Sequence, residues 1–233
     1  MTKRILVCLI SFFLLFSSTV SSVHAAVDFP QATDGQVTEA LARIVPIRIV
    51  PDNPLYFLIT IKETLLRATQ PSSAKRAEFD MILSGKRLKE SYLLLTNKDV
   101  SGASLSLTRY SQRLAKMTDG LGRAKSQNQD VGNLIGEIAD NLRNQEVLFF
   151  AIKARAEGLG NGGDFAKNYN SAAAAFVDAI NSLDNFRPGI RDRFKSATGS
   201  ANSNRDKDLI NSAPKTPGFI EASPEVKPNK IIY

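Results

Sequence analysis

The stretch from 131 to 159, VGNLIGEIADNLRNQEVLFFAIKARAEGL, places apolar side chains at alternating steps of three and four residues. A strand would alternate every second residue, whereas this repeat is typical of an amphipathic helix packed at a shallow angle on its neighbours. The repeat has one polar member, Gln145, and runs through Val131, Ile135, Ile138, Leu142, Gln145, Phe149, Ile152, Ala156 and Leu159. The pattern predicts a helix with one buried face.

The same repeat occurs in three more segments. It is strong through Ala103, Leu107, Tyr110, Leu114, Met117, Leu121 and Ala124, and again through Phe165, Tyr169, Ala172, Phe176, Ala179, Leu183 and Phe186. A weaker stripe of small residues, which would let a neighbouring helix approach closely, runs through Ala74, Ala77, Met81, Ser84, Leu88, Ser91 and Leu95. Short polar or glycine-rich links separate these segments and favour antiparallel sequence neighbours, with Asp164 as a predicted N-cap. The chain is predicted to be all-α, an antiparallel up-and-down helical bundle of about five helices.

The first helix of this bundle is predicted within the stretch 51–71, PDNPLYFLITIKETLLRATQP. Asn53 is a good N-cap, Pro54 suits the first helical turn, and Pro71 is predicted to begin the next helix. One wide face of the helix is apolar and is expected to be covered by the helices that follow: Leu55, Phe57, Leu58, Ile59, Ile61, Leu65 and Leu66. Three charged residues in this stretch argue against a membrane span: Lys62, Glu63 and Arg67. Glu63 and Arg67 have the i to i+4 order that favours a local ion pair.

Several segments of this helical hairpin form a recognisable series: Pro51-Asp52-Asn53-Pro54-Leu55-Tyr56, Leu58, Lys62-Glu63, Leu65, Ala68-Thr69, Ala74-Lys75-Arg76-Ala77-Glu78-Phe79 and Lys86-Arg87-Leu88-Lys89-Glu90. They resemble a prokaryotic domain-of-unknown-function family that opens with Pro-Leu-Tyr-x-Leu-Lys and carries Lys-Arg-Ala-Glu and Arg-Leu-x-Glu in its second helix. The resemblance covers about residues 50–95, with general helical patterning to 157. It departs at Ile59-Thr60, where a basic residue is usual, and at Gln70-Pro71-Ser72, where Asp-Pro-Glu is common. It implies an extracytoplasmic helical module of secreted or membrane-anchored proteins, and it brings no catalytic residue.

Residues 1–25 have the three-part plan of a secretory signal peptide. Lys3 and Arg4 precede an apolar run of about a dozen residues, and cleavage is predicted after Ala25. Because about 20 residues are needed to cross a hydrocarbon layer, cleavage is favoured over an uncleaved N-terminal membrane anchor. We expect an exported protein, extracytoplasmic or secreted.

Cleavage would remove the only cysteine and the only histidine, Cys8 and His24. The mature chain would then form no disulfide, and it would lack a Ser-His-Asp or Cys-His nucleophile and the usual zinc ligands. Met81 and Met117, the remaining methionines that could ligate haem, fit core positions. We therefore predict no enzymatic activity, no catalytic residue, no cofactor and no metal site.

Two pairs of neighbouring carboxylates are the remaining acid–base candidates, Glu137 with Asp140 and Glu78 with Asp80. None lies on an apolar stripe, so all four are predicted to lie on solvated faces. The glycine-rich segment 158–163 lacks the preceding strand and Lys-Ser/Thr of a phosphate loop and the acidic ligands of a calcium loop. It is predicted to be a plain interhelical loop.

The chain has a net charge of +7, which falls to +5 without Lys3 and Arg4. The excess lies mainly in residues 187–233, and the rest of the mature chain is nearly neutral without basic residues interleaved with aromatic ones. A nucleic-acid partner is therefore not predicted. The end of the chain is rich in Ser, Asn, Pro and Lys and is predicted to be disordered.

The predicted organisation is a signal peptide at 1–25, an entry segment at 26–52, a helical bundle domain at 53–195 and a disordered basic tail at 196–233. Gln145 is predicted to fix helix register through an interhelical hydrogen bond, or alternatively to bind a ligand. The sequence predicts an exported non-enzymatic protein that contacts cell-envelope or membrane-surface components or another protein. The alternative is an extracytoplasmic small-ligand-binding or sensory module, with an apolar ligand near Gln145, Phe149 and Phe150. The oligomeric state is left open.

Overall fold

The computed structural model describes residues 29, 31–47, 51, 53–159 and 163–197. In these residues the chain is all-α and has no strand: α2 (Asp34–Arg43), α3 (Tyr56–Ala68), α4 (Ser73–Thr96), α5 (Val100–Ser126), α6 (Gly132–Gly158), α7 (Asp164–Phe186) and the 3-10 helix η1 (Arg191–Arg193). The predicted signal peptide, with Cys8 and His24, lies outside the described residues, as does the predicted tail from 198 onward. No helix of the described part combines the length and apolar content needed to cross a bilayer.

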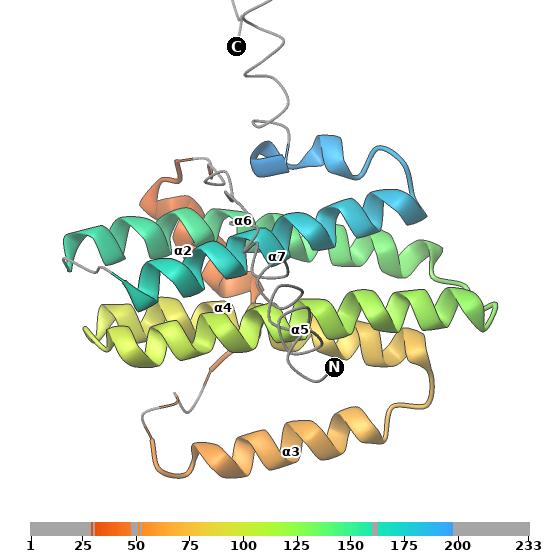
Figure 1. The fold of residues 1–233 in the computed structure, drawn as a ribbon, viewed down its shortest axis with the longest axis horizontal. Helices are drawn as coiled ribbons and strands as arrows, with labels where there is room; N and C mark the ends of the chain where they lie inside the picture. The colour runs from red at the N-terminus through yellow and green to blue at the C-terminus, as the bar shows by residue number, and fades with distance from the viewer. Residues whose placement is uncertain (1–28, 30, 48–50, 52, 160–162, 198–233) are drawn as a thin grey trace, which may run out of the picture.

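The four long helices α4 to α7 surround one core, and their directions alternate along the chain (Figure 1). Helix α4 packs along α5 and α6, and α7 packs along α5 and contacts α6. Helices α5 and α6 are consecutive but do not pack as a pair. The short link between them reverses the chain direction but does not bring the two helices side by side, because α5 packs mainly on α4 and α7.

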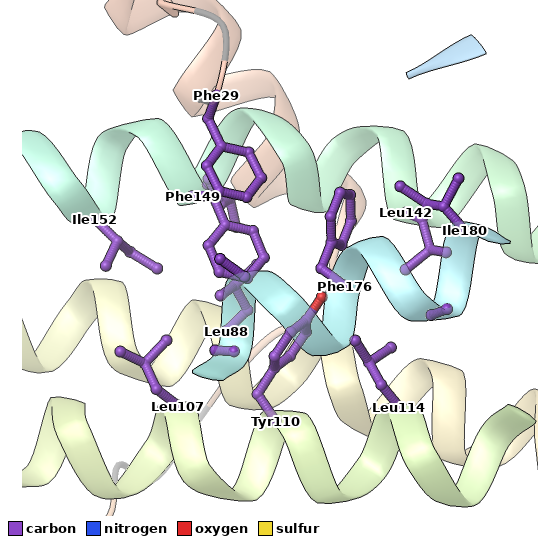
Figure 2. Packing of buried hydrophobic residues seen from close by; sticks show 14 of the residues in the cluster. Phe29, Leu88, Leu107, Tyr110, Leu114, Leu142, Phe149, Ile152, Phe176 and Ile180 are labelled. Carbon is purple, nitrogen blue, oxygen red and sulfur yellow. The ribbon is translucent and has the colours of Figure 1, made fainter. Parts of the chain in front are cut away.

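The apolar repeats correctly predict the buried faces of the long helices. All seven repeat positions of α5 are at most 1% exposed, and Met81 and Met117 are buried core residues as predicted. The centre of the core is aromatic: the Phe149 ring stacks on Phe29 with their centroids 4.6 Å apart (Figure 2). Three other rings surround Phe149 at centroid distances of 5.4, 5.8 and 5.3 Å: Tyr110, Tyr169 and Phe176.

The packed core extends beyond the predicted bundle domain at both ends. Among the described residues before 53, the buried side chains are Phe29, Val37, Ala40 and Ile44, so the predicted entry segment contributes helix α2 to the core. Lys89 of α4 holds the end of α2, since its Nζ atom donates to the main-chain oxygens of Leu41 and Ile44 at 2.7 and 3.2 Å. After residue 195, Ser196 and Ala197 are buried.

Three helix starts differ slightly from their predicted positions. Helix α3 begins at Tyr56, because the Asn53 side chain accepts from the main-chain N–H of Leu55 at 2.9 Å in a turn before the helix. Helix α4 begins at Ser73 and is capped by the Ser72 side chain, so that Pro71 precedes it. For α7 the capping position is Gly163, with a φ of 67°, and Asp164 is the first helical residue.

The predicted close approach of a helix to α4 is confirmed at Ala77. A Cβ atom added to Gly120 of α5 would lie 3.1 Å from the Ala77 Cβ and 3.3 Å from its Cα. Both neighbouring atoms are fixed to the backbone, so neither can move aside without shifting a helix. Gly122, two residues further along α5, has nothing within 4 Å of its added Cβ.

We expect Gly120→Leu to destabilise the fold by about 1–3 kcal/mol, because the new side chain must separate α4 from α5. Gly122→Ala on the exposed side of the same helix should instead stabilise it by up to about 1 kcal/mol through helix propensity. Urea unfolding monitored by circular dichroism measures both changes. Equal effects of the two substitutions would show that α4 and α5 do not meet at Gly120.

Candidate functional site

Helix α3 turns the opposite face inward from the one predicted. The side chains that face the bundle are Tyr56, Ile59, Glu63 and Arg67, of which Tyr56 and Glu63 are buried. Six large apolar side chains of the predicted core face are instead 42–61% exposed: Leu55, Phe57, Leu58, Ile61, Leu65 and Leu66. We call these six residues the α3 apolar face. The expectation that later helices cover it is wrong, because the side of α4 that meets α3 carries charges.

The main contact between α3 and α4 is a buried ionic cluster centred on Arg87. The Arg87 guanidinium donates to both carboxylate oxygens of Glu90 at 2.8 Å, and it also donates to Glu63 and to the Tyr56 hydroxyl. The Tyr56 hydroxyl in turn donates to Glu90 at 2.9 Å. Lys86 completes the cluster through an ion pair with Glu63. One arginine therefore lies between a carboxylate from each helix.

A further buried carboxylate, Asp80, holds the other end of α3 against α4. Its side chain is fully buried and accepts from Arg67 Nε at 2.7 Å and from Arg113 Nη1 at 2.9 Å. The prediction that Asp80 lies on a solvated face is therefore wrong. The predicted local pair of Glu63 and Arg67 is replaced by these longer-range pairs to α4, because Asp80 and Arg87 need partners once they are buried.

The other predicted carboxylates lie nearer to solvent. Glu137 and Asp140 are exposed as predicted, and Asp140 pairs with Arg193. Glu78 is half-buried and pairs with Lys75 at 2.6 Å. None of these three carboxylates belongs to the ionic cluster.

The aromatic ring of Tyr56 also contacts cations. The guanidinium carbons of Arg87 and Arg109 each lie 5.5 Å from the ring centroid, within the range of a cation–π contact. The Nη1 atom of Arg109 is buried without a hydrogen-bond partner. The negative ring face of Tyr56 is therefore the group placed to compensate Arg109.

Burial, together with the charge of Glu90, keeps the Tyr56 hydroxyl protonated. Burial raises the pKa of the Tyr56 phenol well above its ordinary value of 10.0, and the negative charge of Glu90 raises it further against the opposing effect of Arg87. Burial lowers the pKa of the Arg87 guanidinium, but Glu90 and Glu63 outweigh this effect and raise its pKa overall. Tyr56 is thus a stable donor to Glu90, and Arg87 stays charged.

The ionic cluster has the properties of a structural contact between α3 and α4, and not those of a catalytic acid–base pair. Both carboxylates of the cluster are paired with cations, and Arg87 is held between them. Among the described residues, no group of three or more His, Cys, Asp or Glu side chains is placed to hold a metal ion. What the arrangement does is to fix the rotation of α3 about its own axis.

The predicted interhelical hydrogen bond of Gln145 is confirmed. Its Oε1 atom accepts from the Tyr110 hydroxyl at 2.9 Å, and its Nε2 atom donates to Ser84 Oγ at 3.4 Å. The residue therefore joins α4, α5 and α6. Two surface hollows, of about 520 Å³ beside α2 and η1 and about 230 Å³ beside the start of α4, have neither Gln145 nor Phe149 in their lining.

Comparison of the chain with protein-family models, with curated proteins and with solved structures finds no match. The resemblance of residues 50–95 to a domain-of-unknown-function family therefore stays a prediction.

We expect Arg87→Met to release α3 from the bundle. Removing one partner of a buried ion pair typically costs about 3–5 kcal/mol, and here two carboxylates would lose their shared cation. Hydrogen exchange followed by mass spectrometry should show lost protection over residues 56–68, while the repeats of α5 and α7 stay protected.

Lys75→Met is the matched control, since it breaks the exposed pair with Glu78 and should change stability by less than about 1 kcal/mol. The quadruple change Glu63→Leu, Lys86→Met, Arg87→Met and Glu90→Leu should protect α3 better than Arg87→Met alone, because no charge of the cluster is left without its partner. Unchanged exchange in the Arg87→Met variant would contradict the fastening role.

We expect Tyr56→Phe to lower stability by about 1–3 kcal/mol near neutral pH, because Glu90 and Arg87 lose a hydrogen-bond partner. The raised pKa of Tyr56 means that the folded protein holds the phenol proton more tightly than the unfolded chain does. Its stabilisation is fully present below pH 10 and declines as the pH rises above it. Unfolding of both proteins from about pH 7 to about pH 11 should show the difference narrowing above pH 10, whereas a constant difference would contradict it.

Proposed function

We propose that this chain is an exported, non-enzymatic protein, folded as an antiparallel up-and-down helical bundle, which works by contact of the α3 apolar face with a component of the cell envelope or with another protein. The observation that carries the proposal is the outward direction of that face. Besides these six residues, the large apolar side chains exposed in the described part are Val45 and Leu105, which lie on other segments. Exposed apolar side chains are common when scattered, but a contiguous patch marks an interaction site.

The way α3 is fastened supports an interaction role. Burying an ion pair contributes little net stability, and well-packed apolar residues often stabilise as well or better. An amphipathic helix that served stability alone would turn its apolar face toward the core. In α3 the charged side is buried and the apolar side is offered to the surroundings, which is the arrangement expected of a helix that presents a contact surface.

Export is supported by the predicted signal peptide at 1–25 and by the family resemblance. The ligand-binding alternative has less support. Phe149, at the centre of its proposed site, is fully buried among four aromatic rings, so that an apolar ligand would have to displace one of them. Gln145 already makes hydrogen bonds through both of its side-chain polar atoms.

Photo-crosslinking in living cells that produce the protein tests the proposed contact. With p-benzoylphenylalanine in place of Phe57, we expect crosslinked products several times more abundant than with the same group in place of Leu105, because both positions are about half exposed but only Phe57 lies on the α3 apolar face. The products are resolved by gel mobility and mass spectrometry. Equally low yields at the two positions would contradict the proposed function.

A further inference from the structure

We propose that the α3 apolar face binds a lipid surface that contains anionic headgroups. The inference rests on the proposed function and names its partner. A helix advances 100° per residue, so Ile61 and Leu65 lie on the side directly opposite Glu63, with Phe57 and Leu58 beside them. Since Glu63 is fixed toward α4, the centre of the apolar ridge points straight away from the bundle.

The charges of the helix are also arranged for an anionic surface. Glu63 is the only acidic residue of α3, and it is buried and paired with Arg87 and Lys86. Lys62 is exposed within the α3 apolar face, between Leu58 and Leu66, where its long side chain can reach the headgroups while its apolar stem follows the helix. No carboxylate of α3 therefore points outward to repel anionic lipid, and Lys62 contributes a favourable charge.

The shape of the surface favours a membrane over a second copy of the chain. Helix α3 runs along the outer edge of the molecule, and the other labelled helices lie on one side of it (Figure 1). Two copies would bring two convex ridges together. Six half-exposed side chains offer on the order of 500 Å² per copy, below the roughly 800 Å² per partner of a standard stable interface.

A lipid surface adapts its shape to such a ridge, and an interfacial helix buries its apolar side at the boundary of headgroups and acyl chains. The polar side of an interfacial helix usually faces water. In this protein it faces α4, so the ionic cluster would hold the whole bundle at the lipid surface through α3.

The absence of tryptophan from the chain allows a direct test with the full protein. Phe57→Trp places a single fluorophore on the α3 apolar face, and Leu105→Trp places a matched one on α5. With vesicles of phosphatidylcholine and phosphatidylglycerol, we expect the emission of the Phe57→Trp protein to shift to shorter wavelength and to be quenched by brominated acyl chains. The Leu105→Trp protein should show neither change.

Adding Ile61→Asn and Leu65→Asn to the Phe57→Trp protein should weaken the apparent vesicle affinity about tenfold or more, because two large apolar side chains are lost from the contact. Both positions are exposed, so circular dichroism should confirm an unchanged fold. Lys62→Gln should weaken binding to the anionic vesicles by a few-fold and leave binding to pure phosphatidylcholine unchanged.

An unquenched Phe57→Trp signal in the presence of vesicles would overturn the membrane contact, even if the protein bound vesicles through another segment. A blue shift that depends on protein concentration and not on lipid would overturn it in favour of a second copy. If the crosslinks at Phe57 in cells persist while lipid quenching fails, the proposed function stands and this inference falls. If both fail, both are rejected.

Discussion

The rotation of α3 depends on Arg87, which is held between Glu63 of α3 and Glu90 of its own helix. A guanidinium shielded from water is costly unless its charge is compensated, so the two helices can approach only in the orientation that supplies Glu63. Tyr56 and Arg67, on the same side of α3, add partners for Glu90 and Asp80. When that side of α3 is turned inward, the α3 apolar face points away from the bundle.

The molecule therefore uses two kinds of packing side by side. The four long helices and α2 meet through an apolar core whose centre is a cluster of aromatic rings around Phe149 (Figure 2). Helix α3 meets the same α4 mainly through charges and a phenol. The first kind of contact is non-directional and tolerates small rearrangements, whereas the second fixes one geometry because each hydrogen bond has a direction. The apolar core supplies most of the stability of the fold, and the ionic cluster around Arg87 determines which side of α3 faces outward.

The regular helices could be predicted because their signal is local. The three-and-four repeats of α5, α6 and α7 predict both the helix and its buried face, and every position of the α5 repeat is buried. Residues 29–44 were harder to place, since their few buried side chains are too short a series to show a repeat. The Thr33 and Gln36 capping box was the available signal for α2.

The orientation of α3 could not be read in the same way, because apolar residues alone suggest the wrong side. A signal did exist in the charged residues. Glu63 and Arg67 lie one turn apart on α3, and Asp80 and Arg87 lie two turns apart on α4, with the acidic residue first in both helices. In an antiparallel hairpin that order brings each charge toward an opposite one, but it becomes recognisable only when the two helices are compared as a pair.

The stacking of Phe29 on Phe149 has a consequence for how the chain acquires its fold. One ring lies near the start of the described chain, and its partners Phe149 and Phe176 lie on α6 and α7. The N-terminus emerges first, whether the chain leaves a ribosome or a translocation channel. Phe29 therefore cannot pack against its partners until most of the helices have emerged. Such distant closure slows folding and leaves the early segment accessible to chaperones, so the last helices to arrive complete the core around Phe29.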